Sequence, residues 1–360
     1  MIIKNADVLL GDFKFSKTDI KFGEKIEQIG EINCADDVLD LSGYYVIPGI
    51  CDIHTHGAVD VDAMDENVDF GKWKKFLLSK GITTFFPSTV TGTEDEILRA
   101  VKNLEESDGI NLEGPFLSPA KKGAHEESKI CGVSLELLEK IKHKVKITTV
   151  APEMHNNMEQ IEKITKLGIK VSIGHTAADY ETSKKAFEKG ATHITHSFNA
   201  MPSLHHRDPG LLGAAFENDN VFCEVISDGV HLHPSVVRLI YSAVGADRMI
   251  LISDSMRATG LDDGEYTLGG LFVIVKDGKA TLEDGTIAGG TSTLYDVVKS
   301  AVSFGIPLCD AVKMATLTPC RAVGMDDRVG SLEVGKDADI TVLDKDLNVI
   351  KVFYKGKSQM

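Results

Sequence analysis

The chain has 360 residues, of which 42% are hydrophobic and 26% are charged, and its formal net charge is −15 at pH 7. This length suffices for one large α/β domain and a small companion domain. The negative net charge argues against nucleic acid and anionic membranes as partners, because like charges repel. No run of Lys and Arg forms a local basic patch that would override it.

The sequence shows no pattern typical of a secretory signal or a membrane-spanning segment. No basic segment followed by an apolar one opens the chain, and no stretch approaches the roughly 20 apolar residues of a membrane-spanning helix. The cysteines are scattered without a Cys-x-x-Cys pair, which fits reduced thiols. They are Cys34, Cys51, Cys131, Cys223, Cys309 and Cys320. We therefore expect a cytoplasmic protein.

Both ends of the chain resemble short antiparallel strands. Residues 1–47 alternate apolar and polar side chains with turn residues between them, and the same pattern returns after residue 330. We expect residues 1–48 and 330–360 to form one small β-sandwich domain.

The middle of the chain repeats a different pattern, in which short apolar runs are separated by amphipathic segments. There are eight such runs: Ile50–Ile53, Ile82–Phe86, Ile110–Leu112, Val145–Val150, Ile169–Ile173, Thr192–Thr195, Val221–Ile226 and Met249–Ile252. Eight strand–helix units close a barrel, so we predict an α/β fold with a TIM-like (β/α)8 barrel over residues 49–329.

Helices are expected between and after these runs. The predicted helices are Phe70–Ser79, Glu94–Glu106, Leu135–His143, Met158–Leu167, Glu181–Lys189, Pro234–Val244, Leu294–Phe304 and Leu308–Ala315. A hairpin-like insertion is expected after the eighth run, ahead of the last two helices.

The first run ends in a pair of histidines. His54 and His56 are two residues apart, so both would project from one face of the strand as it ends. Gly57 follows and leaves room for the backbone to turn or for a ligand to approach. Two imidazoles on one face can bind one metal ion.

Polar residues also follow the later strands, where active sites of such barrels lie. They are Glu113 after the third run, His175 after the fifth, His196 after the sixth, Asp228 and His231 after the seventh, and Asp254 after the eighth. Imidazole and carboxylate ligands without thiolates suit zinc or ferrous iron with an open position for water. Such an ion lowers the pKa of its water to about 7, which predicts a hydrolytic site.

Several motifs along the chain carry a family resemblance. They are Leu112-Glu113-Gly114-Pro115-Phe116, Gly174-His175-Thr176, Thr195 to Pro202, His206 to Gly210, Asp228-Gly229-Val230-His231 and Ser253-Asp254-Ser255-Met256. In this order and spacing they resemble the N-acetylglucosamine-6-phosphate deacetylase family of the amidohydrolase superfamily. The resemblance extends from about residue 40 to the segment Gly335–Asp339.

This resemblance implies metal-dependent hydrolysis of a linear amide, in which N-acetyl-D-glucosamine 6-phosphate gives D-glucosamine 6-phosphate and acetate. It implies that Glu113, His175 and His196 bind the principal divalent ion. Zinc or iron fits best, and manganese or cobalt is also compatible. Asp254 would take a proton from the attacking water and deliver it to the departing nitrogen.

The resemblance also assigns groups that contact the substrate. His231 would hydrogen-bond the acetamide carbonyl and stabilise the oxyanion. Arg207 would bind the phosphate, with its loop serving the neighbouring subunit of a homodimer. The remaining sugar-pocket positions are Ala124, Asn199, Ala200, Asp228, Ile287, Ala288, Gly289 and Gly290. Apart from the family resemblance, Arg207 would be interpreted as a solvated surface charge, and the pair Gly289 and Gly290 as part of a turn.

The His pair bears on the number of ions. Some members of the family lack it and use one ion, whereas members that have it can hold a second ion beside the first, with the Glu as a bridge. We therefore expect His54 and His56 to give this chain a second ion. His193, three residues before His196, would face away from the site.

Three other functions are possible for a barrel of this kind. A cyclic-amide hydrolase of the dihydroorotase or hydantoinase kind often uses a carboxylated Lys after strand four, but the segment Thr148–Glu153 has no Lys. An N-acyl-amino-acid deacylase and a non-catalytic barrel are the remaining alternatives. The sequence leaves open activity on N-acetylgalactosamine 6-phosphate and a role in amino-sugar catabolism or cell-wall recycling.

Overall fold

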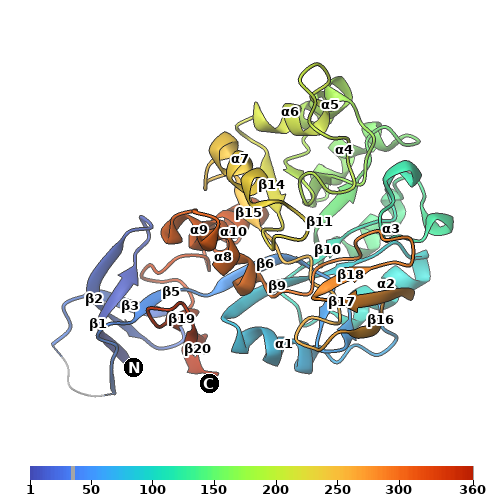
Figure 1. Cartoon of the computed structure of the whole chain (residues 1–360). Coiled ribbons are helices and arrows are strands. Elements are labelled where there is room, and N and C mark those ends of the chain that lie inside the picture. Colours follow the sequence, from blue (N-terminus) through green and yellow to red (C-terminus); the bar gives the residue numbers. More distant parts are fainter. Residues whose placement is uncertain (34–36, 360) are drawn as a thin grey trace.

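A computed structural model describes residues 1–33 and 37–359. Figure 1 shows two bodies, with a sheet that contains both chain termini on one side and a larger barrel on the other. Cys34 lies outside the described residues, and the other five cysteines are unpaired. Within the described residues, no helix has the length and apolar character needed to span a bilayer.

The larger body is a barrel of eight strands, and each adjacent pair in its sheet is parallel. The strands are β6 (Ile50–Thr55), β9 (Ile82–Thr89), β10 (Ile110–Leu112), β11 (Val145–Val150), β12 (Lys170–Ile173), β13 (His193–Ile194), β14 (Phe222–Val225) and β15 (Met249–Leu251). The two ends of the sheet meet where Thr55 and Ser255 form a parallel bridge and the Asp254 N–H donates to the His54 carbonyl at 2.9 Å. The predicted (β/α)8 barrel is confirmed.

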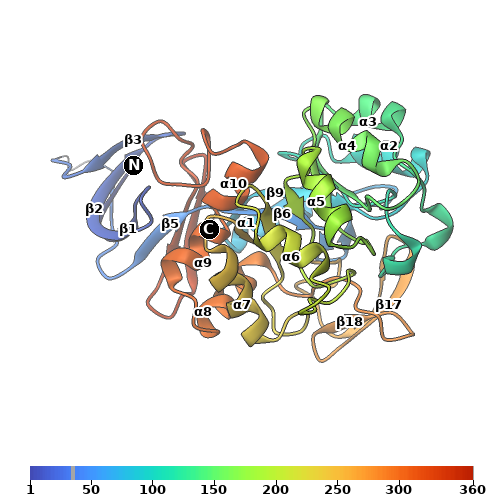
Figure 2. The same cartoon turned by 90° about the horizontal axis from the view of Figure 1, so that it is seen from above.

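Helices surround the barrel, as the view from above in Figure 2 shows. Eight of them match predicted helices within a few residues at each end. They are α1 (Phe70–Ser79), α2 (Glu94–Asn103), α3 (Leu135–Ile141), α4 (Asn157–Lys166), α5 (Tyr180–Glu188), α7 (Pro234–Val244), α8 (Leu294–Ser303) and α9 (Leu308–Met314).

The helix starts follow from local chemistry. Thr93 caps α2 by accepting from the Glu96 N–H, while the Glu96 carboxylate accepts from the Thr93 N–H, and Thr293 and Asp296 repeat this reciprocal pair at α8. Such pairs satisfy N–H groups that have no partner within the helix.

Four short helical segments were not predicted. They are α6 (Gly210–Phe216), α10 (Leu317–Val323), η1 (Pro119–Lys121) and η2 (Glu127–Lys129). So short a segment gives little periodicity, and α6 also contains two glycines, which disfavour helix, whereas α3 and α9, which are equally short, were predicted.

The smaller body is a sheet built from both ends of the chain, and this small β-sandwich matches the prediction. Its strands are β1 (Ile2–Leu9), β2 (Phe15–Phe22), β3 (Ile26–Gly30), β4 (Val38–Asp40), β5 (Tyr45–Pro48), β19 (Ile340–Leu343), β20 (Val349–Tyr354) and β21 (Lys357–Ser358). The antiparallel pairing of β5 with β19 joins the two chain ends. Because only Gly49 separates β5 from β6, we propose that the domains divide at about residues 49 and 330.

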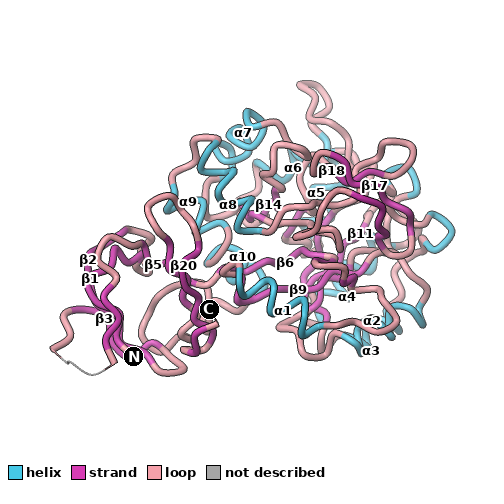
Figure 3. The backbone as a smooth tube through the Cα atoms, turned by 60° about the horizontal axis from the view of Figure 1, so that its bottom comes forward, coloured by secondary structure: helices cyan, strands magenta, loops and turns pink. Residues whose placement is uncertain are grey.

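A three-stranded insertion follows the eighth barrel strand, where the sequence predicted a hairpin. Strands β16 (Gly264–Leu268), β17 (Leu271–Lys276) and β18 (Lys279–Thr281) are antiparallel, and a two-stranded ribbon, β7 (Gly57–Ala58) and β8 (Val61–Asp62), follows β6. Figure 3 shows β17 and β18 on the outside of the barrel strands. Leu268 and the turn after β18 contribute to the rim of a cavity.

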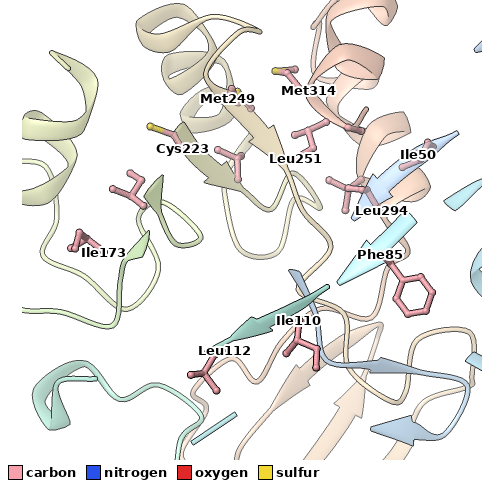
Figure 4. Close-up of a cluster of buried hydrophobic side chains, with 14 of the residues drawn as sticks. Ile50, Phe85, Ile110, Leu112, Ile173, Cys223, Met249, Leu251, Leu294 and Met314 are labelled. Atoms are coloured by element: carbon pink, nitrogen blue, oxygen red, sulfur yellow. The ribbon is translucent and has the colours of Figure 1, made fainter. Parts of the chain in front are cut away.

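The main core fills the space between the barrel strands and the helices. Figure 4 shows Leu251 of β15 near Leu294 of α8 and Met314 of α9, and all three side chains are fully buried. The barrel strands are buried along most of their length, as is typical of parallel strands covered by helices.

We expect Leu251→Ala to lower the free energy of unfolding by about 2–5 kcal/mol, because it removes buried methyl groups and leaves a cavity. Urea unfolding followed by circular dichroism measures the change. Leu239→Ala is the matched control, since this Leu of α7 is 50% exposed and should change stability little. Equal effects of the two substitutions would contradict this account of the core.

Candidate active site

A cavity of about 470 Å³ opens at the end of the barrel to which the carboxyl ends of the strands point. Its lining includes His56 after β6, Glu113 after β10, and Asp254 after β15. The cavity also reaches the insertion through Leu268 and Ile287. The predicted strand-end residues therefore meet at one place.

The carboxylate of Glu113 lies at the centre of these residues and is 2% exposed. Its Oε1 is 3.2 Å from Nε2 of His175 and 3.0 Å from Nε2 of His196. The two Nε2 atoms are 3.0 Å apart. The three residues expected to bind the principal ion thus present their ligand atoms to a single point.

The His pair lies on the other side of the same carboxylate. Nε2 of His56 is 3.1 Å from Oε2 of Glu113 and 3.1 Å from Oδ1 of Asp254. Nε2 of His54 is 3.5 Å from Oε1 of Glu113 and 3.4 Å from Oδ1 of Asp254. These four residues form one group able to hold an ion, in which Asp254 joins the His pair.

Main-chain carbonyls fix the ring nitrogens of His56 and His175 that face away from Glu113. Nδ1 of His56 lies 3.1 Å from the Ser88 carbonyl, and Nδ1 of His175 lies 2.9 Å from the Lys121 carbonyl. A carbonyl accepts only from a protonated nitrogen, so in the neutral form of each ring the hydrogen is on Nδ1 and Nε2 is the nitrogen that can bind a metal. The buried Nε2 of His54 has no hydrogen-bond partner among the described residues, which also fits a ligand atom.

The charges of the cluster stabilise each other. Burial alone would raise the pKa of Glu113, but the charge of His54 and hydrogen bonds from other imidazoles hold it well below its usual range. Burial alone would lower the pKa of His56, yet hydrogen bonds to Asp254 and Glu113 raise it to about 9. The carboxylates therefore create a site that favours positive charge.

Asp254 is buried and remains ionised. Burial acts to raise its pKa, but the charge of His54 and a hydrogen bond from His56 lower it below the usual range. The backbone of Asp254 has a φ of 48°, and His175 and His196 also have positive φ, at 46° and 28°. Non-glycine residues seldom adopt this conformation, which is frequent at functional sites.

His231 also lines the cavity and is fixed by Asp228. Nδ1 of His231 lies 2.7 Å from Oδ2 of Asp228, whose Oδ1 accepts from the His231 N–H at 2.8 Å. Although burial acts to raise it, these hydrogen bonds lower the pKa of Asp228. The contact assigns hydrogen to Nδ1 whenever the imidazole is neutral, and Nε2 is left for a ligand.

The structure places only some of the predicted sugar-pocket residues on the cavity wall. The ones on the wall are Ala124, Asn199, Ala200, His231, Ile287 and Gly289. Asp228 instead supports His231, and Ala288 packs in a small core with Met256. His193 is buried against the ring of Phe222 and is not part of the wall, as predicted.

The Gly pair has a steric role in addition to forming a turn. The Gly290 N–H donates to the Asp254 carbonyl at 2.6 Å, and a Cβ at Gly290 would lie 2.6 Å from the Ser253 carbonyl oxygen. The strand-end backbone and this segment can approach so closely only because Gly has no side chain.

Arg207 is exposed and does not line the cavity of its own chain. Its Nη1 lies 2.7 Å from Nε2 of the neighbouring His206. The cavity wall instead includes two cationic residues that the sequence analysis did not single out, Lys121 and Lys122.

The sequence analysis also missed His125, which is 4% exposed and lines the cavity. The Thr91 N–H donates to Nδ1 of His125 at 3.0 Å, so Nε2 carries the hydrogen and faces Oε2 of Glu113 at 3.4 Å. Burial lowers the pKa of His125 to about 4, which keeps the ring neutral. Its position directly after Ala124 was the available signal.

Glu224 was missed as well. It lies on β14 with no exposure, and Oε2 is 3.0 Å from Nδ1 of His54. A charged residue in the middle of the apolar run Val221–Ile226 was the signal for it.

Comparison with known proteins agrees with this geometry. A model of the amidohydrolase family matches residues 45–358. The chain belongs to the amidohydrolase family. Relatives that are 32–36% identical over most of the chain are named as deacetylases of N-acetylglucosamine 6-phosphate or N-acetylgalactosamine 6-phosphate, which confirms the resemblance inferred from the motifs.

Three of these proteins are informative. An N-acetylglucosamine-6-phosphate deacetylase of Bacillus subtilis is 36% identical, covering 99% of this chain and 93% of its own length. An N-acetylgalactosamine-6-phosphate deacetylase of Escherichia coli O157:H7 is 32% identical, with 86% of each chain covered. The structure of an Asp-to-Ala mutant of the Mycobacterium smegmatis N-acetyl-D-glucosamine-6-phosphate deacetylase, in complex with N-acetyl-D-glucosamine 6-phosphate, superposes with a TM-score of 0.95 at 33% identity. That alignment covers 100% of this chain and 99% of the other.

We expect His54→Gln combined with His56→Asn to remove one of two divalent ions per chain, because the imidazoles of the second site are lost while Oε1 of Glu113 and Nε2 of His175 and His196 remain. Metal analysis of the purified protein gives the stoichiometry. His205→Gln with His206→Asn is the matched control, since this adjacent pair is exposed. An unchanged ion count in the first variant would mean that the His pair is only a wall of the cavity.

Proposed function

We propose that this amidohydrolase is a divalent-metal-dependent deacetylase that hydrolyses N-acetyl-D-glucosamine 6-phosphate to D-glucosamine 6-phosphate and acetate. The observation that carries the proposal is the convergence of four imidazole Nε2 atoms on the carboxylates of Glu113 and Asp254 beside the cavity. Relatives that align with nearly the whole chain are named as deacetylases of this sugar phosphate.

We assign the principal ion to Glu113, His175 and His196, and a second ion to His54 and His56 together with Asp254. Imidazoles and carboxylates without a thiolate favour zinc or iron over magnesium or calcium, and manganese or cobalt could also be held. When bound, such an ion acidifies water and polarises a carbonyl.

Asp254 is proposed as the general base and general acid. It is the ionised strand-end carboxylate at the edge of the cluster and lines the cavity. It would take a proton from the attacking water and return it to the amide nitrogen, which cannot leave as an unprotonated anion. His125, which also lines the cavity, is neutral and donates toward Glu113.

His231 is proposed to bind the acetamide carbonyl. Asp228 fixes its Nδ1, so the ring would present Nε2–H to the substrate only in its protonated form, or accept a hydrogen bond when neutral. As an imidazolium paired with the Asp228 carboxylate, it would stabilise the negative charge that develops on the carbonyl oxygen.

The phosphate group needs cations at the mouth of the cavity. We propose that Arg207 supplies one to the neighbouring subunit of a homodimer, because it is exposed and lies away from the cavity of its own chain. Lys121 and Lys122 would be the cations that each chain contributes to its own cavity. The predicted cytoplasmic location and pathway role stay predictions.

N-acetylgalactosamine 6-phosphate is a second candidate substrate, because the E. coli relative is named as a deacetylase of that sugar phosphate. The cyclic-amide alternative has less support, since the similarity to a D-hydantoinase is 16% in sequence and bears on the fold alone. Acetate release from a panel of N-acetyl sugars, with and without the 6-phosphate, tests all of these candidate substrates. Release from neither phosphorylated sugar in the metal-loaded protein would refute the proposal.

We expect Asp254→Asn to lower kcat by roughly 10²–10⁴-fold, since proton transfer to the leaving nitrogen is lost. The ion held by Glu113, His175 and His196 should remain. Acetate release and metal analysis measure the two effects. Asp339→Asn is the matched control, because Asp339 is also a buried carboxylate but lies outside the cavity, and full activity in Asp254→Asn would exclude the proposed role.

We expect Arg207→Ala to raise KM for the phosphorylated sugar far more than for unphosphorylated N-acetylglucosamine. Arg321→Ala, at an exposed Arg paired with Asp247, is the control. Coexpressing the Arg207→Ala and Asp254→Asn chains tests the subunit exchange. A mixed dimer contains one intact site if Arg207 acts on the neighbour, and activity no greater than that of the separate variants would contradict it.

A further inference from the structure

The side chain of Glu224 lies inside the barrel, where its carboxylate has no contact with solvent. It belongs to β14, between the buried residues Cys223 and Val225. Isolating a carboxylate from water is costly unless other groups compensate its charge. The proposed reaction, as assigned above, makes no use of this residue.

Its contacts point to one histidine of the site. Oε2 of Glu224 is 3.0 Å from Nδ1 of His54 and 3.4 Å from the backbone N of His196. Oε1 has no hydrogen-bond partner among the described residues. The ring of His54 is therefore the main group that compensates this buried charge.

His54 differs in this respect from the other imidazoles around Glu113. Backbone carbonyls face Nδ1 of His56 and His175, and Nδ1 of His196 has no partner in the described part of the chain. Only His54 of these four has a carboxylate behind its ring. A carboxylate there orients the ring, fixes the hydrogen on Nδ1 and makes Nε2 a stronger donor to a metal.

Charge balance gives a second reason. Two adjacent divalent ions carry four positive charges, whereas the ligands Glu113 and Asp254 supply two negative charges. Glu224 adds a third, transmitted through the ring of His54, on the side of the second ion.

We infer that Glu224 is a positioning residue that allows the second divalent ion to bind, by orienting His54 and supplying negative charge behind it. This inference rests on the proposed function. It identifies Glu224 as the residue that decides whether the site holds one ion or two. The ion assigned to Glu113, His175 and His196 does not depend on it, apart from the long contact to the His196 backbone.

The test is Zn²⁺ binding to the metal-stripped full-length chain, measured by calorimetry and by metal analysis after dialysis. Gln keeps an oxygen acceptor for Nδ1–H of His54 but removes the charge. Glu224→Gln should therefore weaken the second Zn²⁺ by roughly 10- to 100-fold and leave the first nearly unchanged. Asp339→Asn, which also removes a buried carboxylate, should bind both ions as the unaltered chain does.

A double substitution separates positioning from a general effect on folding. In a His54→Gln background, Glu224→Gln should cause no further loss of Zn²⁺ affinity, because its route to the ion has been removed. A further loss of similar size there would overturn the inference. If Glu224→Gln does not fold, Glu224→Asp replaces it and must still weaken the second ion selectively.

The outcomes also distinguish this inference from the proposed function. Two ions of unchanged affinity in Glu224→Gln would overturn the role of Glu224 while acetate release by the unaltered chain still supports the deacetylase. A single Zn²⁺ in the unaltered chain would overturn the second site and the role of Glu224 together. Loss of both ions in Glu224→Gln, with the fold intact, would contradict selectivity for the second site.

Discussion

The buried carboxylate of Glu113 is the group on which the geometry of the site depends. Its Oε1 faces His175 and His196, and its Oε2 faces His56, so both oxygens are used. A carboxylate with 2% exposure stays ionised only if positively charged or hydrogen-bonding groups replace water. Those groups come from strands far apart in sequence, and only a closed barrel brings the carboxyl ends of all these strands within a few ångströms of one atom pair.

Holding the strand ends in this way has an energetic cost that the core offsets. His175, His196 and Asp254 adopt positive φ, a conformation that costs about 1–3 kcal/mol per non-glycine residue. Burial of a single Leu or Ile side chain contributes about 1.5–3 kcal/mol, and the strands that carry the site are lined by many of them. The strain at the site is thus comparable with the contribution of a few core residues, such as Leu251 and Leu112, and can be sustained.

The barrel was predictable because its strands are buried on both faces and appear in the sequence as short, mainly hydrophobic runs that alternate with amphipathic segments. The strand-end residues such as Glu113 and Asp254 followed from that assignment and from the rule for barrel active sites. His125 could not be found in this way, since a loop and not a strand brings it to the cavity. Glu224 was hidden for the opposite reason: it lies within a strand, and the orientation of a side chain into the barrel is not encoded by a short apolar run. The exposure of Arg207 is likewise set by a loop whose path no periodicity reveals.

Two carboxylates inside the barrel act on the same residue from different sides. Asp52 accepts from Oγ of Ser253 at 2.5 Å and lies 3.3 Å from the His54 backbone N, whereas Glu224 contacts the His54 ring. Burial raises the pKa of Asp52 to about 7, so near neutral pH its negative charge is only partly present and its main effect is to fix the backbone. His54 is therefore held at both backbone and ring. His56 is held at both as well, because its N–H donates to the Ser255 carbonyl at 2.7 Å and Nδ1 of its ring faces the Ser88 carbonyl. The two histidines differ in the group behind each ring, which is a carboxylate for His54 and a neutral carbonyl for His56, and of the two only His56 lines the cavity.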